Sequence, residues 1–234
     1  MLLDCSNALL LAVKKKQSSE IVRISNLFAT FHFENAITQL NSDADKIVFW
    51  VNIYNAYFQI IATEKSKELL VKRSDFFKEK QILLFGLKLS FDEIEHGILR
   101  RSKWKLSLGF INKPFPKKWE QKLRVQQLDF RIHFLLNCGA VSCPIIFPLS
   151  MDNFEEEIEE ATKTYLIQEA FISNKKIILN QLFLFYIADF GGRKGLKQIL
   201  LAYNIINIKQ MNYKFKFTEF DKAAKLDNFV EKKK

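Results

Sequence analysis

The segment from Asp43 to Lys65 constrains the fold more than any other part of the sequence. Its apolar residues lie on almost every side of a helix, a pattern that indicates a helix buried inside a domain rather than one at the surface. They are Val48, Phe49, Val51, Ile53, Tyr54, Tyr57, Phe58, Ile60 and Ile61. We therefore expect the rest of the chain to pack around this segment.

Two polar residues, Asn52 and Asn55, interrupt this apolar helix and lie on one face of it. Asparagine is a poor residue for a helix interior because its amide competes with the backbone. A buried amide without partners costs about 1–3 kcal/mol. Two roles remain open, namely fixing neighbouring loops and donating hydrogen bonds into a cleft.

A second constraining segment runs from Asp129 to Pro144 and reads DFRIHFLLNCGAVSCP. Its first half alternates with a period of two, which predicts a strand over 130–137. The strand is followed by a turn at Cys138-Gly139, where glycine permits backbone angles closed to other residues. Two of the three cysteines, Cys138 and Cys143, and one of the three histidines, His133, fall here. A thiol on a turn after a strand is a geometry suited to an active site.

The remaining pattern predicts a helix-rich α+β fold in which a single domain, residues 1–234, packs around a small and mainly antiparallel sheet. Residues 1–42 form an N-terminal helical extension in this prediction. Helices are expected up to about residue 16 and over about 19–40, 91–101, 151–170 and 194–203. A hairpin is expected over 82–90, strands over 175–179 and 213–217, and a basic loop over 103–127.

His96 lies on the predicted helix 91–101, which starts with the capping-box pair Ser90 and Glu93. Asp92 is four residues before His96 and on the same face, so it is the better local residue to orient the imidazole. Glu95 is adjacent in sequence and is expected to point about 100° away.

Charge and cysteine content limit the class of protein. The net charge of +10 comes from 36 basic and 26 acidic residues, but the lysines are scattered, so the charge does not favour nucleic-acid binding. An odd count of three cysteines favours a reducing compartment, and we expect a cytoplasmic protein. No signal peptide is expected, because the apolar run at 8–13 precedes the basic cluster at 14–16. No segment approaches the roughly 18 apolar residues of a membrane span. The oligomeric state is not indicated.

Four segments together resemble the domain-of-unknown-function family 547 (DUF547), in the order of that family and over about residues 45–205. They are FWVNIYNA at 49–56, DEIEHGILR at 92–100, RIHF through NCGAVSCP at 131–144, and DFGG at 189–192. In the pattern of the family, a thiol at Cys138 is typical, whereas the position of Cys143 is often serine. The resemblance therefore favours Cys138 over Cys143 as a nucleophile.

The first functional hypothesis is a cysteine-dependent hydrolase or acyltransferase acting on a peptide or another amide-type substrate, with no cofactor. Cys138 attacks the substrate and His96 activates the thiol. Asp92, Glu95 or Asp189 orients the imidazole, and papain-like and transglutaminase-like enzymes are the nearest analogy.

Two further choices remain within this hypothesis. Asn52 or Asn55, together with backbone amides near Gly139, stabilises an oxyanion. His133 competes with His96 as the base, but it precedes Cys138 by five residues, about 16 Å along an extended strand, and reaches the thiol only if the turn doubles back.

Two alternatives belong to other classes. Cys138, Cys143, His96 and His133 form a set chemically suited to zinc, or the two thiols form a redox-active disulfide. In the other alternative the same polar residues form a buried hydrogen-bond network in a noncatalytic structural or interaction domain.

Overall fold

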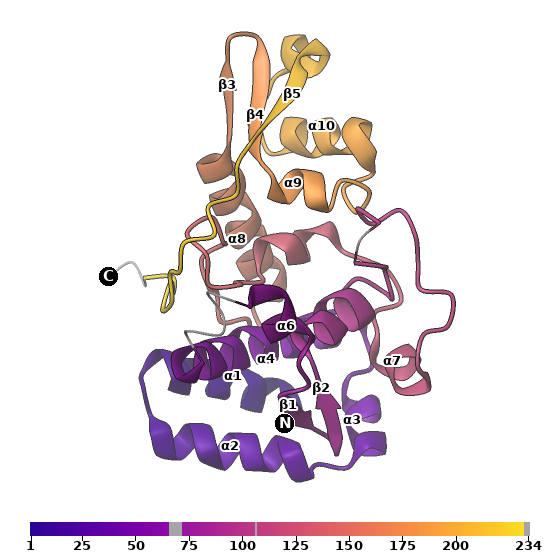
Figure 1. The fold of residues 1–234 in the computed structure, drawn as a ribbon, viewed down its shortest axis with the longest axis vertical. Helices are drawn as coiled ribbons and strands as arrows, with labels where there is room; N and C mark the ends of the chain where they lie inside the picture. Colours follow the sequence, from indigo (N-terminus) through magenta and orange to yellow (C-terminus); the bar gives the residue numbers. More distant parts are fainter. Residues whose placement is uncertain (66–71, 106, 232–234) are drawn as a thin grey trace.

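A computed structural model of the chain describes residues 1–65, 72–105 and 107–231. Helices dominate, and the described strands form one sheet of two strands and one of three (Figure 1). Two of the three strand pairings are antiparallel and one is parallel. The structure thus confirms the prediction of a helix-rich α+β fold with a small, mainly antiparallel sheet. None of the described helices is both long enough and apolar enough to cross a membrane.

The predicted central helix is α4, Asp43–Glu64. The Ser42 side chain accepts from the backbone of Asp45, and the Asp45 side chain accepts from that of Ser42, so a capping box fixes its start. Sixteen of its 22 residues are buried. Helix α1 (Leu2–Lys14) packs along α4, and α2 (Ser18–Thr30) packs against α1. The core of this half of the molecule is therefore built around α4, the segment that the sequence predicted to be buried.

The prediction of one helix over 19–40 is wrong. Two helices, α2 and α3 (Phe33–Gln39), are separated by Phe31 and His32, whose backbone is extended. The half-buried rings of Phe31 and Phe33 both pack against the core cluster around α4. The extended link lets both rings reach that cluster, which explains the break.

The predicted hairpin is present as β1 (Ile82–Leu84) and β2 (Leu87–Leu89), paired antiparallel. Its two turn residues, Phe85 and Gly86, both have positive φ, as a tight two-residue turn requires. The short helix α6 (Arg73–Lys78) precedes the hairpin.

The basic segment 103–127 is not loop throughout, because residues 118–123 form α7 (Lys118–Leu123); residue 106 lies outside the described residues. The Gln121 side chain donates to the carbonyl of Pro116, just before this helix, and buried Leu123 packs into the core. The proline-rich start of the segment is irregular, as predicted.

The predicted strand over 130–137 is also wrong. Phe130–Phe134 is a 3-10 helix, η2, whose first turn is capped by the Asp129 side chain accepting from Arg131. Ile132, His133 and Phe134 are buried one after another, so the alternation of apolar and polar letters does not separate an inner from an outer face. His133 is the polar but buried residue that gave this segment the alternation of a strand.

The other half of the molecule contains the three-stranded sheet, ordered β3-β4-β5, and the helices around it (Figure 1). Strand β3 was not predicted, whereas β4, β5 and the two longer helices lie within about three residues of their predicted ranges. The elements are α8 (Phe154–Glu169), β3 (Ala170–Ser173), β4 (Lys176–Asn180), α9 (Leu182–Phe185), α10 (Gly192–Ala202), the 3-10 helix η3 (Ile208–Asn212) and β5 (Lys214–Thr218).

Two apolar clusters hold these halves, one around α4 and one around Phe134, Phe183 and Phe190. Cys138 contacts both clusters. The loop that carries the candidate nucleophile therefore lies where the two halves of the core meet.

After β5 the chain runs back as an extended segment, residues 219–231, which we call the C-terminal strap (Figure 1). Its backbone pairs with the Cys138 loop, since Lys225 N–H donates to Gly139 and Val141 N–H donates to Ala223. Farther on, Val230 accepts a bond of 2.6 Å from Lys14 Nζ of α1. The strap thus joins the sheet, the Cys138 loop and the N-terminal half.

Candidate active site

Residues 93–99 form a π-helix, η1 (Glu93–Leu99), rather than the predicted α-helix. Arg100 N–H donates to Glu95 and Ser102 N–H donates to Gly97, both five residues back and both at 2.8 Å. The wider turn brings adjacent side chains together, and Glu95 Oε1 lies 3.4 Å from His96 Nδ1. The expectation that Glu95 points away from His96 is therefore wrong.

Arg100 determines the protonation of His96. This arginine is almost fully buried and donates from Nη1 to His96 Nδ1 at 2.8 Å. An arginine has no acceptor, so Nδ1 must accept and neutral His96 carries its proton on Nε2. Burial lowers the pKa of His96, and the charge of Arg100 adds to this against the opposing charge of Glu95. Nε2 is 3.8 Å from Asp92 Oδ1, so the predicted orienting residue is close but not hydrogen-bonded.

Asp189 links Arg100 to the second histidine. Its Oδ2 accepts from Arg100 Nε at 2.6 Å and from His133 Nε2 at 2.9 Å. Burial would raise the pKa of Asp189, but these two partners lower it to about 2. The His133 ring stacks on Tyr186, and burial lowers the pKa of His133. Asp189 therefore orients His133 directly and reaches His96 only through Arg100.

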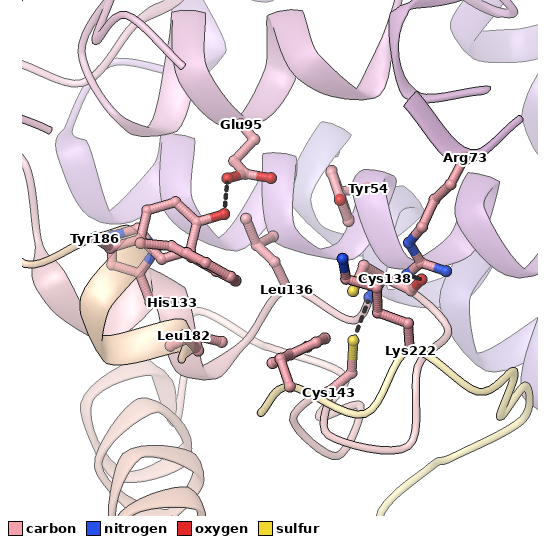
Figure 2. A pocket seen from close by; sticks show the side chains of 12 residues that line it. Tyr54, Arg73, Glu95, His133, Leu136, Cys138, Cys143, Leu182, Tyr186 and Lys222 are labelled. Carbon is pink, nitrogen blue, oxygen red and sulfur yellow. Dashed lines mark hydrogen bonds between the residues drawn. The ribbon is translucent and has the colours of Figure 1, made fainter. Parts of the chain in front are cut away.

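Cys138 and Cys143 lie side by side on the loop that follows η2 (Figure 2). The Sγ atom of Cys143 accepts from the backbone N–H of Cys138 at 3.2 Å and of Ala140 at 3.4 Å. A hydrogen bond from the Cys143 thiol, aided by the charge of Arg73, lowers the pKa of Cys138 to about 7 although burial opposes it. Burial raises the pKa of Cys143 well above its ordinary value. Cys138 is therefore the thiol that ionises first.

Two pockets of about 190 and 370 Å³ meet at Cys138. Five side chains besides Cys138 line both pockets: Tyr54, Arg73, Glu95, Phe185 and Tyr186. His133 lines the smaller pocket and His96 the larger. Glu95 accepts a bond of 2.6 Å from the Tyr186 hydroxyl, and Figure 2 shows this pair across the pocket from Cys138.

Three of the four predicted site residues, Cys138, His96 and Glu95, line the same pocket. Within the described ranges neither histidine is hydrogen-bonded to Cys138, and the side-chain partners are Arg100 for His96 and Asp189 for His133. The structure thus places Cys138 and His96 on one cavity without joining them as a dyad.

The fourth predicted residue, Asn52, fixes a loop. Its amide donates to the Leu149 carbonyl at 2.8 Å and accepts from the Leu149 N–H at 2.9 Å. Asn55 likewise donates to Leu135 and accepts from Asn137. In the part of the chain that the structure describes, neither asparagine lines the two pockets. Of the two roles left open by the sequence, the fixing of loops is the one observed.

Sequence reasoning missed the contributions of Arg73, Tyr186 and Arg100. For Arg100 a signal existed, since it follows His96 by four residues and therefore lies on the same face of the helix predicted over 91–101. Arg73 lies on a short helix about 65 residues before Cys138 and donates to the Cys138 carbonyl at 2.5 Å. The local sequence around Arg73 does not predict this contact. Among the described residues, no group of three or more His, Cys, Asp and Glu side chains is placed to hold a metal ion.

Comparison with known proteins assigns the family. A search of curated proteins found no match, and a search of solved structures found none. A family model matches residues 37–166, a range that holds three of the four motif segments and stops before the segment at 189–192. The match covers more than half of the 234 residues. The chain belongs to the family described as protein of unknown function, DUF547.

Proposed function

We propose that this protein is a cysteine-dependent hydrolase or acyltransferase with Cys138 as its nucleophile. The observation that carries the proposal is the Cys138 thiol itself, which faces both pockets and has a pKa of about 7. A thiolate is the reactive form, and at neutral pH about half of a thiol with this pKa is ionised. Cys143 and Arg73 support that ionisation, so no histidine has to remove the proton.

His96 then takes a different role from the one suggested by sequence. Its proton lies on Nε2, and Nδ1 is occupied by Arg100. A neutral imidazole fixed in this tautomer is a hydrogen-bond donor, suited to stabilise an oxyanion rather than to accept a proton. We assign His96 to that role in the larger pocket.

Glu95 supplies the base. Burial would raise its pKa, but the adjacent His96, the charge of Arg100 and the bond from Tyr186 lower it, so Glu95 is a carboxylate at neutral pH. It lines both pockets with Cys138. In the second half of the reaction it takes the proton from the incoming water or amine.

The reaction proceeds through a thioester. The Cys138 thiolate attacks the acyl carbon of an amide-type substrate, and the leaving amine departs with a proton taken from water, which replaces the proton that the thiol released when it ionised. Water then releases the acyl group in a hydrolase, whereas an amine accepts it in an acyltransferase. The attack and the release of the acyl group both use side chains that line the pockets.

The nucleophile is tested by alkylating the intact protein with iodoacetamide at a series of pH values and mapping each thiol by mass spectrometry. Cys138 should react with a midpoint near pH 7. Cys5, whose pKa is raised by burial, serves as the internal reference. A Cys138 that reacts no faster than Cys5 at pH 7 would refute the proposal.

The roles of the other residues are tested with p-nitrophenyl acetate as an acyl donor. Wild type should release a burst of about one nitrophenol per Cys138, and Cys138→Ser should release none. His96→Gln should slow the burst, whereas Glu95→Gln should retain the burst and slow the turnover that follows. If both variants lost the burst and the later turnover equally, the separate roles assigned to His96 and Glu95 would be refuted.

A noncatalytic domain is the second candidate, because Arg100 and Asp189 join both histidines into one buried network. In that case His96→Gln lowers the melting temperature, and neither the alkylation of Cys138 nor the burst changes in protein that remains folded. Circular dichroism of each variant identifies the folded samples.

A further inference from the structure

We infer that the substrate of this site carries an anionic group, a carboxylate, which Arg73 and Lys222 hold beside the acyl carbon that Cys138 attacks. The inference rests on the proposed function and names its substrate class. Arg73 and Lys222 both line the smaller pocket together with Cys138.

Arg73 and Lys222 are positively charged, and no carboxylate among the described residues forms an ion pair with either of them. Arg73 donates to a neutral acceptor, the carbonyl oxygen of Cys138, and its guanidinium lies over the Phe77 ring with 5.5 Å to the centroid. Within residues 1–65, 72–105 and 107–231, neither Arg73 nor Lys222 forms an ion pair. Two cations therefore border a small pocket without a carboxylate of this chain against either of them.

The carboxylates of the two pockets have hydrogen-bond partners of their own. Glu95 accepts from Tyr186 and lies 3.4 Å from His96. Lys105 contacts both oxygens of Asp92 at 2.7 Å in the larger pocket. Arg73 and Lys222 therefore lie on the Cys138 side of the smaller pocket, whereas its carboxylate, Glu95, lies across the pocket beside Tyr186.

The C-terminal strap brings Lys222 to this position. Asp221 N–H donates to Ser142 Oγ at 3.0 Å, and Ser142 N–H donates to the Asp221 carbonyl, so the residue next to Lys222 is bonded to the Cys138 loop. Figure 2 shows Lys222 and Arg73 on the same side of the pocket as Cys138. These bonds fix the backbone beside Lys222 against the Cys138 loop, and the exposed lysine side chain lines the smaller pocket.

The size and lining of the pocket limit the ligand. A cavity of about 190 Å³ admits a group of a few heavy atoms, and Leu182, Phe185 and Phe220 give it an apolar wall. A guanidinium and an ammonium recognise a carboxylate through charge-assisted hydrogen bonds. The acyl donor is therefore a small, partly apolar acyl group that carries a carboxylate close to the reacting carbon.

The test compares two alkylating reagents of similar size, iodoacetate and iodoacetamide, at Cys138 in the intact protein. Both reagents require the thiolate, so the ratio of their rates cancels the pKa of Cys138 and reports the charge of the pocket. The ratio is divided by that of free N-acetylcysteinamide, whose only charge is its thiolate. We expect a normalised ratio of about three or more at low salt, falling toward one at ~1 M salt, where charges are screened beyond ~3 Å.

Matched variants assign the effect. Lys222→Gln and Arg73→Gln should each lower the normalised ratio toward one, and Lys222→Glu should take it below one. Lys225→Gln is the control, because Lys225 lies on the same strap, is exposed and bonds to Gly139 through its backbone. It should leave the ratio unchanged.

The outcomes separate the two proposals. Rapid reaction with iodoacetamide and a normalised ratio of one in wild type overturns the carboxylate inference and leaves the nucleophile in place. A raised ratio that survives both Lys222→Gln and Arg73→Gln also overturns it. Slow reaction of Cys138 with both reagents overturns the proposed function and this inference together.

Discussion

The backbone N–H of Cys138 donates to Sγ of Cys143 at 3.2 Å, so the loop turns back until the two cysteines touch. The contact makes the thiols unequal. Cys143 is 6% exposed and its pKa is raised, whereas the pKa of Cys138 is lowered to about 7 by the hydrogen bond that Cys143 donates. Cys143 therefore acts on its neighbour rather than on a ligand.

Substitution of Cys143 should change the acidity of Cys138. Cys143→Ala removes the donor, and we expect the pH midpoint of Cys138 alkylation to move from about 7 toward its ordinary value of 9.0. Cys143→Ser is the matched control, because a hydroxyl both donates and accepts and should keep the midpoint near 7. An unchanged midpoint in the alanine variant would show that Arg73 alone sets the pKa.

Asn52→Ala should destabilise the protein strongly. The change leaves the buried N–H and carbonyl of Leu149 without partners, which costs about 2–5 kcal/mol of the free energy of unfolding. Asn26→Ala, on the exposed face of α2, should change it by less than about 0.5 kcal/mol. Urea titrations measure both. A similar small effect at the two positions would contradict the role assigned to Asn52.

Gly139→Ala should cost more than Gly86→Ala, although both glycines have φ of +72°. A Cβ at Gly139 would lie 2.6 Å from the ring of Phe58 in the core, whereas a Cβ at Gly86 meets nothing within 4 Å. Gly86→Ala carries only the strain of a left-handed residue, about 1 kcal/mol. We expect at least twice that loss at Gly139, measured by thermal or urea unfolding, and equal losses would rule out the clash.

Acid should unfold the protein in part through Asp189. Its pKa is about 2 in the folded protein against an ordinary 3.8, so the unfolded chain binds a proton first as the pH falls. The stabilisation, about 2 kcal/mol, is complete above pH ~4 and is lost as the pH falls through ~2. Urea titrations between pH 5 and 2 should show a smaller loss for Asp189→Asn than for wild type, while Asp152→Asn, which is exposed, follows wild type.

The two buried histidines should add a separate phase at higher pH. The pKa values of His96 and His133 are lowered from the ordinary 6.5, chiefly by burial. Below pH ~6.5 the unfolded chain binds protons that the folded protein does not, so stability should fall as the pH decreases from there. His133→Gln should flatten this part of the curve, and an unchanged slope would contradict its neutral, buried state.

Elements with strong local signals could be predicted from the sequence. The all-round apolar pattern marked α4 (Asp43–Glu64), and the glycine between two short apolar runs marked the β1–β2 hairpin. Both depend on residues close together in the chain. The loop of the candidate nucleophile, Cys138, could also be located, because its cysteines and glycine are neighbours in sequence.

Features that depend on distant contacts could not be predicted. Phe130–Phe134 has the alternation of a strand, but burial of His133 against Tyr186 and Asp189 favours a 3-10 helix. Arg73 and Lys222 reach Cys138 from segments about 65 and 84 residues away, and the pattern around each of them is that of an ordinary surface. The sequence thus predicted the thiol of the candidate site, Cys138, but not the cations Arg73 and Lys222.

The π-helical turn at Glu93–Leu99 holds one residue more per turn than an α-helix would. A deletion of one residue there would let the segment relax into an ordinary α-helix and rotate everything after it by about 100°. Arg100 would then leave both Asp189 and His96. Chain length in this segment is consequently as restrictive as residue identity, and a homologue that kept the other three motifs but lost a single residue here would have a rearranged pocket.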